Sequence, residues 1–102
     1  MLTVKGTLHF GYTDSEGKAH AEFEMRAPTL DDMEWAIEHA PENSCTARLS
    51  RYVWSRTLTR LGELAPEQIT PELLGGLYYG EYGVLEAAES EILGKLNPAS
   101  TA

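Results

Sequence analysis

The chain has 102 residues, of which 42% are hydrophobic and 24% charged, a composition typical of one globular domain and not of a disordered or fibrous chain. Sixteen acidic and eight basic side chains give a net charge of -8, which argues against a nucleic-acid partner because phosphates are bound by lysine and arginine. Apolar runs are only two or three residues long, there is no secretory signal and a single cysteine excludes an intrachain disulfide, so we expect no membrane partner and a reducing cytoplasm.

Residues 1–27 alternate between apolar and polar side chains, and a glycine-ended turn interrupts the alternation. This period of two predicts a β-hairpin with one buried face. The expected register places Phe10 on that face, opposite Ala21. A register slipped by two residues sets Lys5 opposite Glu24, which keeps the same faces and pairs opposite charges.

A helix is predicted to follow the hairpin. Thr29 and Asp32 are spaced as a capping box, and Pro41 ends the helical pattern. The residues expected on its inner face are spaced three or four apart: Leu30, Met33, Ile37 and Ala40.

The stretch 45–61 contains no acidic residue and predicts the longest helix, closed by Gly62. Its apolar residues fall in two opposite sectors. One holds Cys45, Leu49, Tyr52 and Val53, and the other holds Trp54, Leu58 and Leu61. The second sector either packs against further elements of the same fold or meets another chain.

Charge is unevenly distributed along the sequence. Residues 44–60 carry a balance of +4, whereas 1–43 and 61–102 each carry -6. The basic residues of the middle segment are all arginines: Arg48, Arg51, Arg56 and Arg60. They either pair with the flanking acids within the fold or form a site for an acidic partner.

Two more helices are predicted in the C-terminal part. Thr70 and Pro71 provide an N-cap and a first-turn proline for a short helix, which the glycines beyond it keep from continuing. A final amphipathic helix is expected to start near Glu81 or Tyr82, and residues 97–102 are expected to form a frayed tail.

No arrangement of residues predicts catalysis. His9 and His20 share the polar face of the hairpin without further metal ligands, and Cys45 is expected to be a small buried residue. The glycines lack the lysine and the hydroxyl residue of a phosphate-binding loop. We therefore expect no catalytic residue, no metal and no cofactor.

A cluster of tyrosines near the glycines is the feature most typical of a contact surface. Such rings combine large apolar area with a polar tip, although they can equally complete a core. We predict that they form a groove for an amphipathic helix together with the second sector of the middle helix and a rim arginine. The predicted partner-binding residues are Trp54, Leu58, Leu61, Arg51, Tyr78, Tyr79 and Tyr82.

These elements predict an α+β fold: one domain over 1–96, in which a hairpin at 1–27 packs against three or four helices in 28–96, followed by the tail at 97–102. An isolated hairpin is marginally stable in water, so its apolar face must be covered by the helices or by a second hairpin.

The order of these elements, with the runs 23–29, 61–64 and 77–86, resembles the small tail assembly chaperones of Mu-like and P2-like contractile-tailed phages and prophages. The resemblance covers 2–96, although Glu81 and Gly83 replace an Asp and an Asn in the closing run. It implies a non-enzymatic protein of the bacterial host cytoplasm that keeps the tape measure protein soluble until tail-tube subunits polymerise. Its partners would be the tape measure and tail tube proteins, and it allows a homo-oligomer. The acidic net charge also allows a different function, that of an inhibitor that mimics nucleic acid and blocks a DNA-binding host protein.

Overall fold

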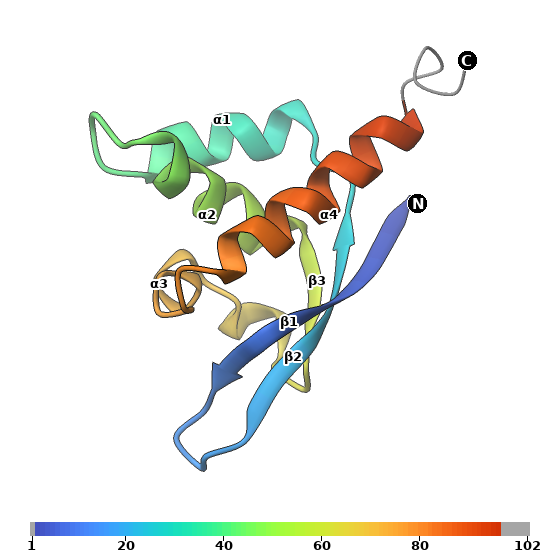
Figure 1. Ribbon diagram of the computed structural model, residues 1–102. Coiled ribbons are helices and arrows are strands. Elements are labelled where there is room, and N and C mark those ends of the chain that lie inside the picture. The colour runs from blue at the N-terminus through green and yellow to red at the C-terminus, as the bar shows by residue number, and fades with distance from the viewer. Residues whose placement is uncertain (1, 97–102) are drawn as a thin grey trace.

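The computed structural model describes residues 2–96, so the tail expected at 97–102 lies outside the described residues. Within that range the chain has an α+β fold, as expected, with a three-stranded antiparallel sheet of order β1-β2-β3 (Figure 1). The elements are β1 (Thr3–Thr13), β2 (Ala19–Arg26), α1 (Leu30–His39), α2 (Thr46–Thr57), β3 (Leu58–Leu61), the 3-10 helix η1 (Pro66–Gln68), α3 (Pro71–Gly75) and α4 (Glu81–Leu96).

The helix expected over 45–61 ends early, because its last four residues form the strand β3. Leu61 of this strand lies opposite Phe23 of β2. Both leucines of β3 are buried, so the strand completes the sheet and covers part of the core. The expected role of Gly62 is wrong, since it follows a strand, and α4, with 16 residues, is the longest helix among the described residues.

The first half of the hairpin follows the register that sets Lys5 opposite Glu24. The register that we expected is therefore wrong. Besides the charge pair, Gly6 favours the observed register: it lies opposite Phe23, whose ring occupies the space where a Cβ would be. A glycine opposite an aromatic ring fixes the alignment of the two strands.

Beyond Thr7 the register shifts, and residues 8–11 of β1 oppose only Ala21 of β2. Gly11 has φ of 75°, and a Cβ there would collide with the backbone of β2. This bulge ends the period of two. As a result Phe10 is 64% exposed, so its expected burial is wrong.

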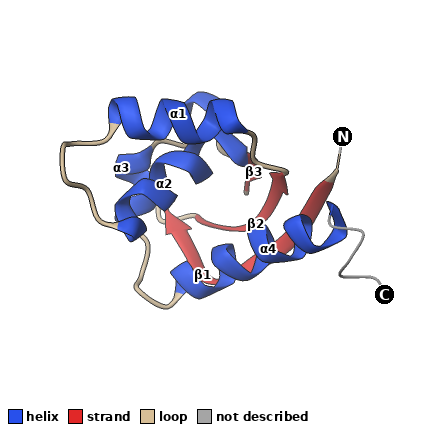
Figure 2. Ribbon diagram, turned by 90° about the horizontal axis from the view of Figure 1, so that it is seen from above, coloured by secondary structure: helices blue, strands red, loops and turns tan. Residues whose placement is uncertain are grey.

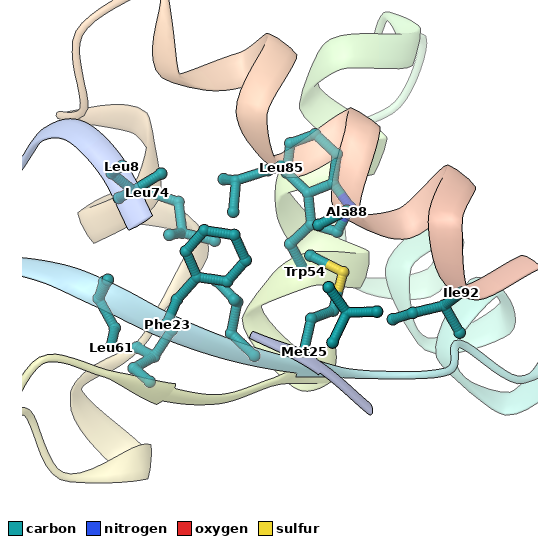
Figure 3. Close-up of a cluster of buried hydrophobic side chains, with 12 residues drawn as sticks. Leu8, Phe23, Met25, Trp54, Leu61, Leu74, Leu85, Ala88 and Ile92 are labelled. Atoms are coloured by element: carbon teal, nitrogen blue, oxygen red, sulfur yellow. The ribbon is translucent and has the colours of Figure 1, made fainter. Parts of the chain in front are cut away.

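The core lies between one face of the sheet and the helices α2 and α4 (Figures 1 and 2). Phe23 and Met25 from β2 point toward Trp54 of α2 and toward residues of α4 (Figure 3). The buried apolar cluster comprises Val4, Leu8, Phe23, Met25, Trp54, Leu58, Leu61, Ile69, Leu74, Leu85, Ala88 and Ile92.

Helix α1 begins with the expected capping box, in which the hydroxyl of Thr29 accepts from the N–H of Asp32. Its inner face differs from our expectation, because the buried residues are Asp32 and Ala36. Arg26 and Arg56 donate to the Asp32 carboxylate over 2.8 to 2.9 Å. Arg26 in particular holds the pKa of Asp32 well below its usual range. Asp32 therefore faces inward, and three residues expected inside are exposed at 76, 54 and 61%: Leu30, Met33 and Ile37.

The two C-terminal helices begin where expected. The Thr70 hydroxyl accepts from the N–H of Leu73 and caps α3, and Pro71 occupies its first turn. Helix α4 begins at Glu81 and runs along β1. None of the helices within residues 2–96 is long and apolar enough to cross a membrane.

Candidate functional site

A cleft of about 910 Å³ lies between α2, α3 and the start of α4. Its walls are formed by the first turns of α2, the end of α3, residues 77–80 of the connection and the first turns of α4. The short helix α3 makes this arrangement, because it stops at Gly75 and the chain then turns back into α4. In Figure 1 these three helices are neighbours.

The cleft brings together most of the residues that the sequence predicted as partner-binding. Those that line it are Arg51, Trp54, Tyr78, Tyr79 and Tyr82. Leu58 and Leu61 do not, since they belong to β3 and are 3 and 0% exposed. Of the two interpretations of this sector, packing within the same fold is the one observed, because these leucines and Trp54 are buried in the core between the sheet and the helices. The prediction that Leu58 and Leu61 line a groove is wrong.

Trp54 and Tyr82 form the floor of the cleft. Trp54 is 2% exposed, and its indole N–H donates to Oε2 of Glu89 on α4 over 3.1 Å. Burial raises the pKa of Glu89. The rings of Trp54 and Tyr82 lie 5.1 Å apart. The hydrogen bond to Glu89 and the ring contact with Tyr82 both join α2 to α4, so they fix the floor of the cleft.

Tyr78 and Tyr79 form the rim, with exposures of 68 and 98%. The sequence left two interpretations of the tyrosine cluster, a contact surface or part of the core, and each applies to different tyrosines. Tyr82 packs against the core, whereas the rim rings project from it. Exposed tyrosines offer a partner large contact area at a low cost in side-chain entropy.

The arginines of the middle segment also divide into two pairs. Arg56 binds the buried Asp32, and Arg60 lies 3.5 Å from Glu22 on the surface. Arg48 and Arg51 line the cleft instead, and neither forms an ion pair with a carboxylate of residues 2–96.

Arg51 is positioned by its surroundings. Its Nη1 donates to the carbonyl oxygen of Pro71 over 3.0 Å. The guanidinium passes over Gly75, where a Cβ would overlap it. The glycine that ends α3 thus leaves room for a cation at the cleft wall, and Arg48 lies one turn earlier on α2.

Cys45 is exposed and lines the cleft, so its expected burial is wrong. It is the N-cap of α2 and lies outside the packed part of that helix. The backbone N–H of Arg48, and then the charge of that arginine, lower the pKa of the Cys45 thiol. A thiol at a helix N-terminus is more reactive for this reason.

Sequence reasoning missed Glu81, which lines the cleft and is 1% exposed. Its Oε1 accepts from the N–H of His9 over 2.8 Å, and its Oε2 accepts from those of Phe10 and Gly11 over 2.9 and 2.8 Å. Burial alone would raise the pKa of Glu81, but these donors outweigh it and the pKa is lowered. Only the position of an acid in an apolar and tyrosine-rich run signals this role in the sequence.

His20 is buried, with 4% of its surface exposed, although the alternation of the hairpin predicted that it lies on the polar face. Its Nδ1 accepts from the N–H of Glu63, so Nε2 carries the proton that bonds Asp14 over 2.9 Å. The missing Cβ of Gly62 lets the ring approach the end of β3. Among residues 2–96 no group of three or more His, Cys, Asp or Glu side chains is placed to hold a metal ion.

Comparison with protein-family models, with curated proteins and with solved structures found no match for this chain. The resemblance to tail assembly chaperones thus stays an expectation. The cleft itself combines an apolar floor, an aromatic rim and two arginines that have no carboxylate partner in the described part of the chain. Such a lining can hold the apolar side of a helix and the acidic residues beside it.

Proposed function

We propose that this protein is a non-enzymatic tail assembly chaperone of a phage or prophage, which binds the tape measure protein in the host cytoplasm before the tail tube polymerises. The observation that carries this proposal is the cleft of about 910 Å³ with Tyr79, 98% exposed, on its rim. Its volume is near the upper end of the roughly 300–1,000 Å³ found for ligand sites, which is room for several side chains of a helix.

The lining of the cleft favours an amphipathic helix as occupant. Apolar side chains of the client would cover Tyr82, whose ring packs on the buried Trp54, and Tyr79 would pack beside them. Acidic residues beside that apolar stripe would meet Arg48 and Arg51, which have no carboxylate partner within residues 2–96. The contact is thus apolar at its centre and charged at its edge, as in many protein interfaces.

The mechanism needs no chemical step. A bound chaperone lowers the free concentration of an aggregation-prone client by mass action and covers its apolar surface. Tail tube subunits that bind the client more tightly would displace the chaperone when the tube forms.

Co-expression with the tape measure protein of a Mu-like or P2-like contractile-tailed phage tests the proposal. We expect the wild-type protein to raise the soluble fraction of the tape measure protein, and Tyr79→Ala to reduce that effect and weaken association by about 1 to 2 kcal/mol. Leu30→Ala is the matched control, because Leu30 is 76% exposed but lies on α1 away from the cleft. A tape measure protein that stays insoluble with the wild-type chaperone contradicts the proposal.

Cys45 reports directly on the occupancy of the cleft, since it is the only cysteine of the chain and lines this site. Bound tape measure protein should slow the reaction of its thiol with a maleimide. The same complex should survive high salt, because its centre is apolar. Capture of a basic DNA-binding protein that salt readily dissociates would instead favour the nucleic-acid mimic.

A further inference from the structure

The bulge of β1 changes the direction of one large side chain. Leu8, before the bulge, is 3% exposed, and a regular strand would bury Phe10 on the same face. The three additional residues of β1 and the positive φ of Gly11 turn Phe10 outward to 64% exposure. Bulges that redirect a side chain in this way are frequent next to functional sites.

Glu81 holds the bulge in place from inside the protein. Three successive N–H groups, those of residues 9–11, converge on its carboxylate, an arrangement that backbone nests use to bind anions. No arginine or lysine of residues 2–96 forms an ion pair with Glu81. A buried charge satisfied by main-chain donors alone fixes the path of the strand, because any other path would leave the carboxylate unpaired.

The bulge is continuous with the cleft. The ring of Phe10 meets the ring of Tyr78 edge to face, with 5.4 Å between centroids, and Tyr78 lines the cleft. Glu81 joins both aromatic residues, since its own N–H donates to the carbonyl oxygen of Tyr78 over 3.0 Å while its carboxylate accepts from Phe10. The exposed ring of β1 therefore extends the aromatic rim that the C-terminal half supplies.

We propose that Phe10 is a binding residue for the acid-bearing amphipathic helix that occupies the cleft, and that Glu81 is the positioning residue that holds Phe10 there. This rests on the proposed function. The occupant is argued from charge and apolar contact: Arg48 and Arg51 line the cleft without a carboxylate partner among residues 2–96, which favours acidic residues in the occupant. The exposed Phe10–Tyr78 pair favours a large apolar side chain beside them.

The probes are two fluorescein-labelled amphipathic helical peptides, both with leucine at every third or fourth position. One carries glutamate beside the leucine stripe and the other carries lysine at the same positions. We expect the wild-type protein to bind the glutamate peptide at least tenfold more tightly than the lysine peptide, as measured by fluorescence anisotropy. Phe10→Ala should weaken binding of the glutamate peptide at least fivefold while the urea midpoint stays unchanged. Phe10→Tyr should retain the wild-type affinity. Ile37→Ala, at a site 61% exposed on α1, should change neither the affinity nor the urea midpoint.

The role of Glu81 is tested by its coupling to Phe10. Glu81→Gln keeps the size of the side chain but replaces one acceptor oxygen with an amide group that cannot accept. If Glu81 acts through Phe10, this change weakens binding in the wild-type background and has no further effect in the Phe10→Ala background. Equal losses in both backgrounds overturn the positioning role, because a merely structural effect would add to the loss of Phe10.

The outcomes separate this inference from the proposed function. Wild-type affinity of Phe10→Ala, together with weakened binding by Tyr79→Ala, overturns the inference and leaves the cleft as the site. Failure of the wild-type protein to bind either peptide overturns both. Should Glu81→Gln fail to fold, the Phe10 series with its Ile37→Ala control still decides whether Phe10 binds.

Discussion

The cleft and the outer face of α1 both expose large apolar side chains, yet their surroundings differ. The face of α1 is a single stripe, Leu30, Met33 and Ile37, on one helix. At the cleft, Tyr78 and Tyr79 form a rim beside two arginines, and Phe10 of β1 contacts the ring of Tyr78.

Each region also contains a buried carboxylate, and the two carboxylates act differently. Asp32 is neutralised by two guanidinium groups and ties α1 to β2 and α2. Glu81 has main-chain donors and redirects a strand. Exposure alone therefore does not distinguish a binding surface. We expect a polar network that holds an exposed ring in position to be the better indicator.

Asp32→Ala should have the largest effect on stability and little effect on binding. Removal of one partner from a buried ion cluster leaves Arg26 and Arg56 without their carboxylate. These arginine side chains are 21 and 35% exposed, so water can solvate them in part. We therefore expect the free energy of unfolding, measured with urea, to fall by about 3 kcal/mol, the low end of the range for a broken buried ion pair. The variant that still folds should bind client as the wild type does.

Arg60→Ala is the control for that experiment. Its partner Glu22 is 72% exposed at the side chain, so the loss should stay below about 1 kcal/mol. An Asp32→Ala protein as stable as Arg60→Ala would show that the cluster does not hold α1.

Acid should weaken both regions, and α1 more. The pKa values of Asp32 and Glu81 are lowered in the folded protein, so the unfolded chain binds more protons as the pH falls through the ordinary range near 4. Their contribution is present above about pH 4 and is lost below it, with up to about 1.4 kcal/mol per pH unit for each carboxyl. Asp32→Asn should flatten the acid limb of the unfolding profile more than Glu81→Gln, because two cations oppose its protonation. Equal slopes for all three proteins would contradict this.

Local patterns predicted where most elements begin. The Thr29 capping box, the Thr70 and Pro71 start of α3 and the start of α4 near Glu81 depend on neighbouring residues, which the sequence displays directly. The tyrosines and Arg51 were likewise placed at one site from residue type and order.

The errors arose where distant residues override the local pattern. Leu58 and Leu61 suit a helix by spacing, but pairing with β2 makes them a strand. Periodicity could not place Phe10, because the bulge depends on a carboxylate 70 to 72 residues away in the sequence. Asp32 of α1 is turned inward for the same kind of reason, since arginines of β2 and α2 reach its carboxylate.

Ile37→Lys should have the smallest effect and tests whether the α1 stripe is a rival binding surface. Ile37 is 61% exposed, and a lysine there lies one helical turn from Glu34, so the stability should change by less than about 0.5 kcal/mol. Because the cleft is built by other helices, the soluble fraction of co-expressed tape measure protein should equal that of the wild type. A lysine that abolished client binding while the urea midpoint stayed constant would move the binding surface from the cleft to α1. The comparison of the two regions would then be reversed, since an exposed stripe without a polar network would have proved sufficient.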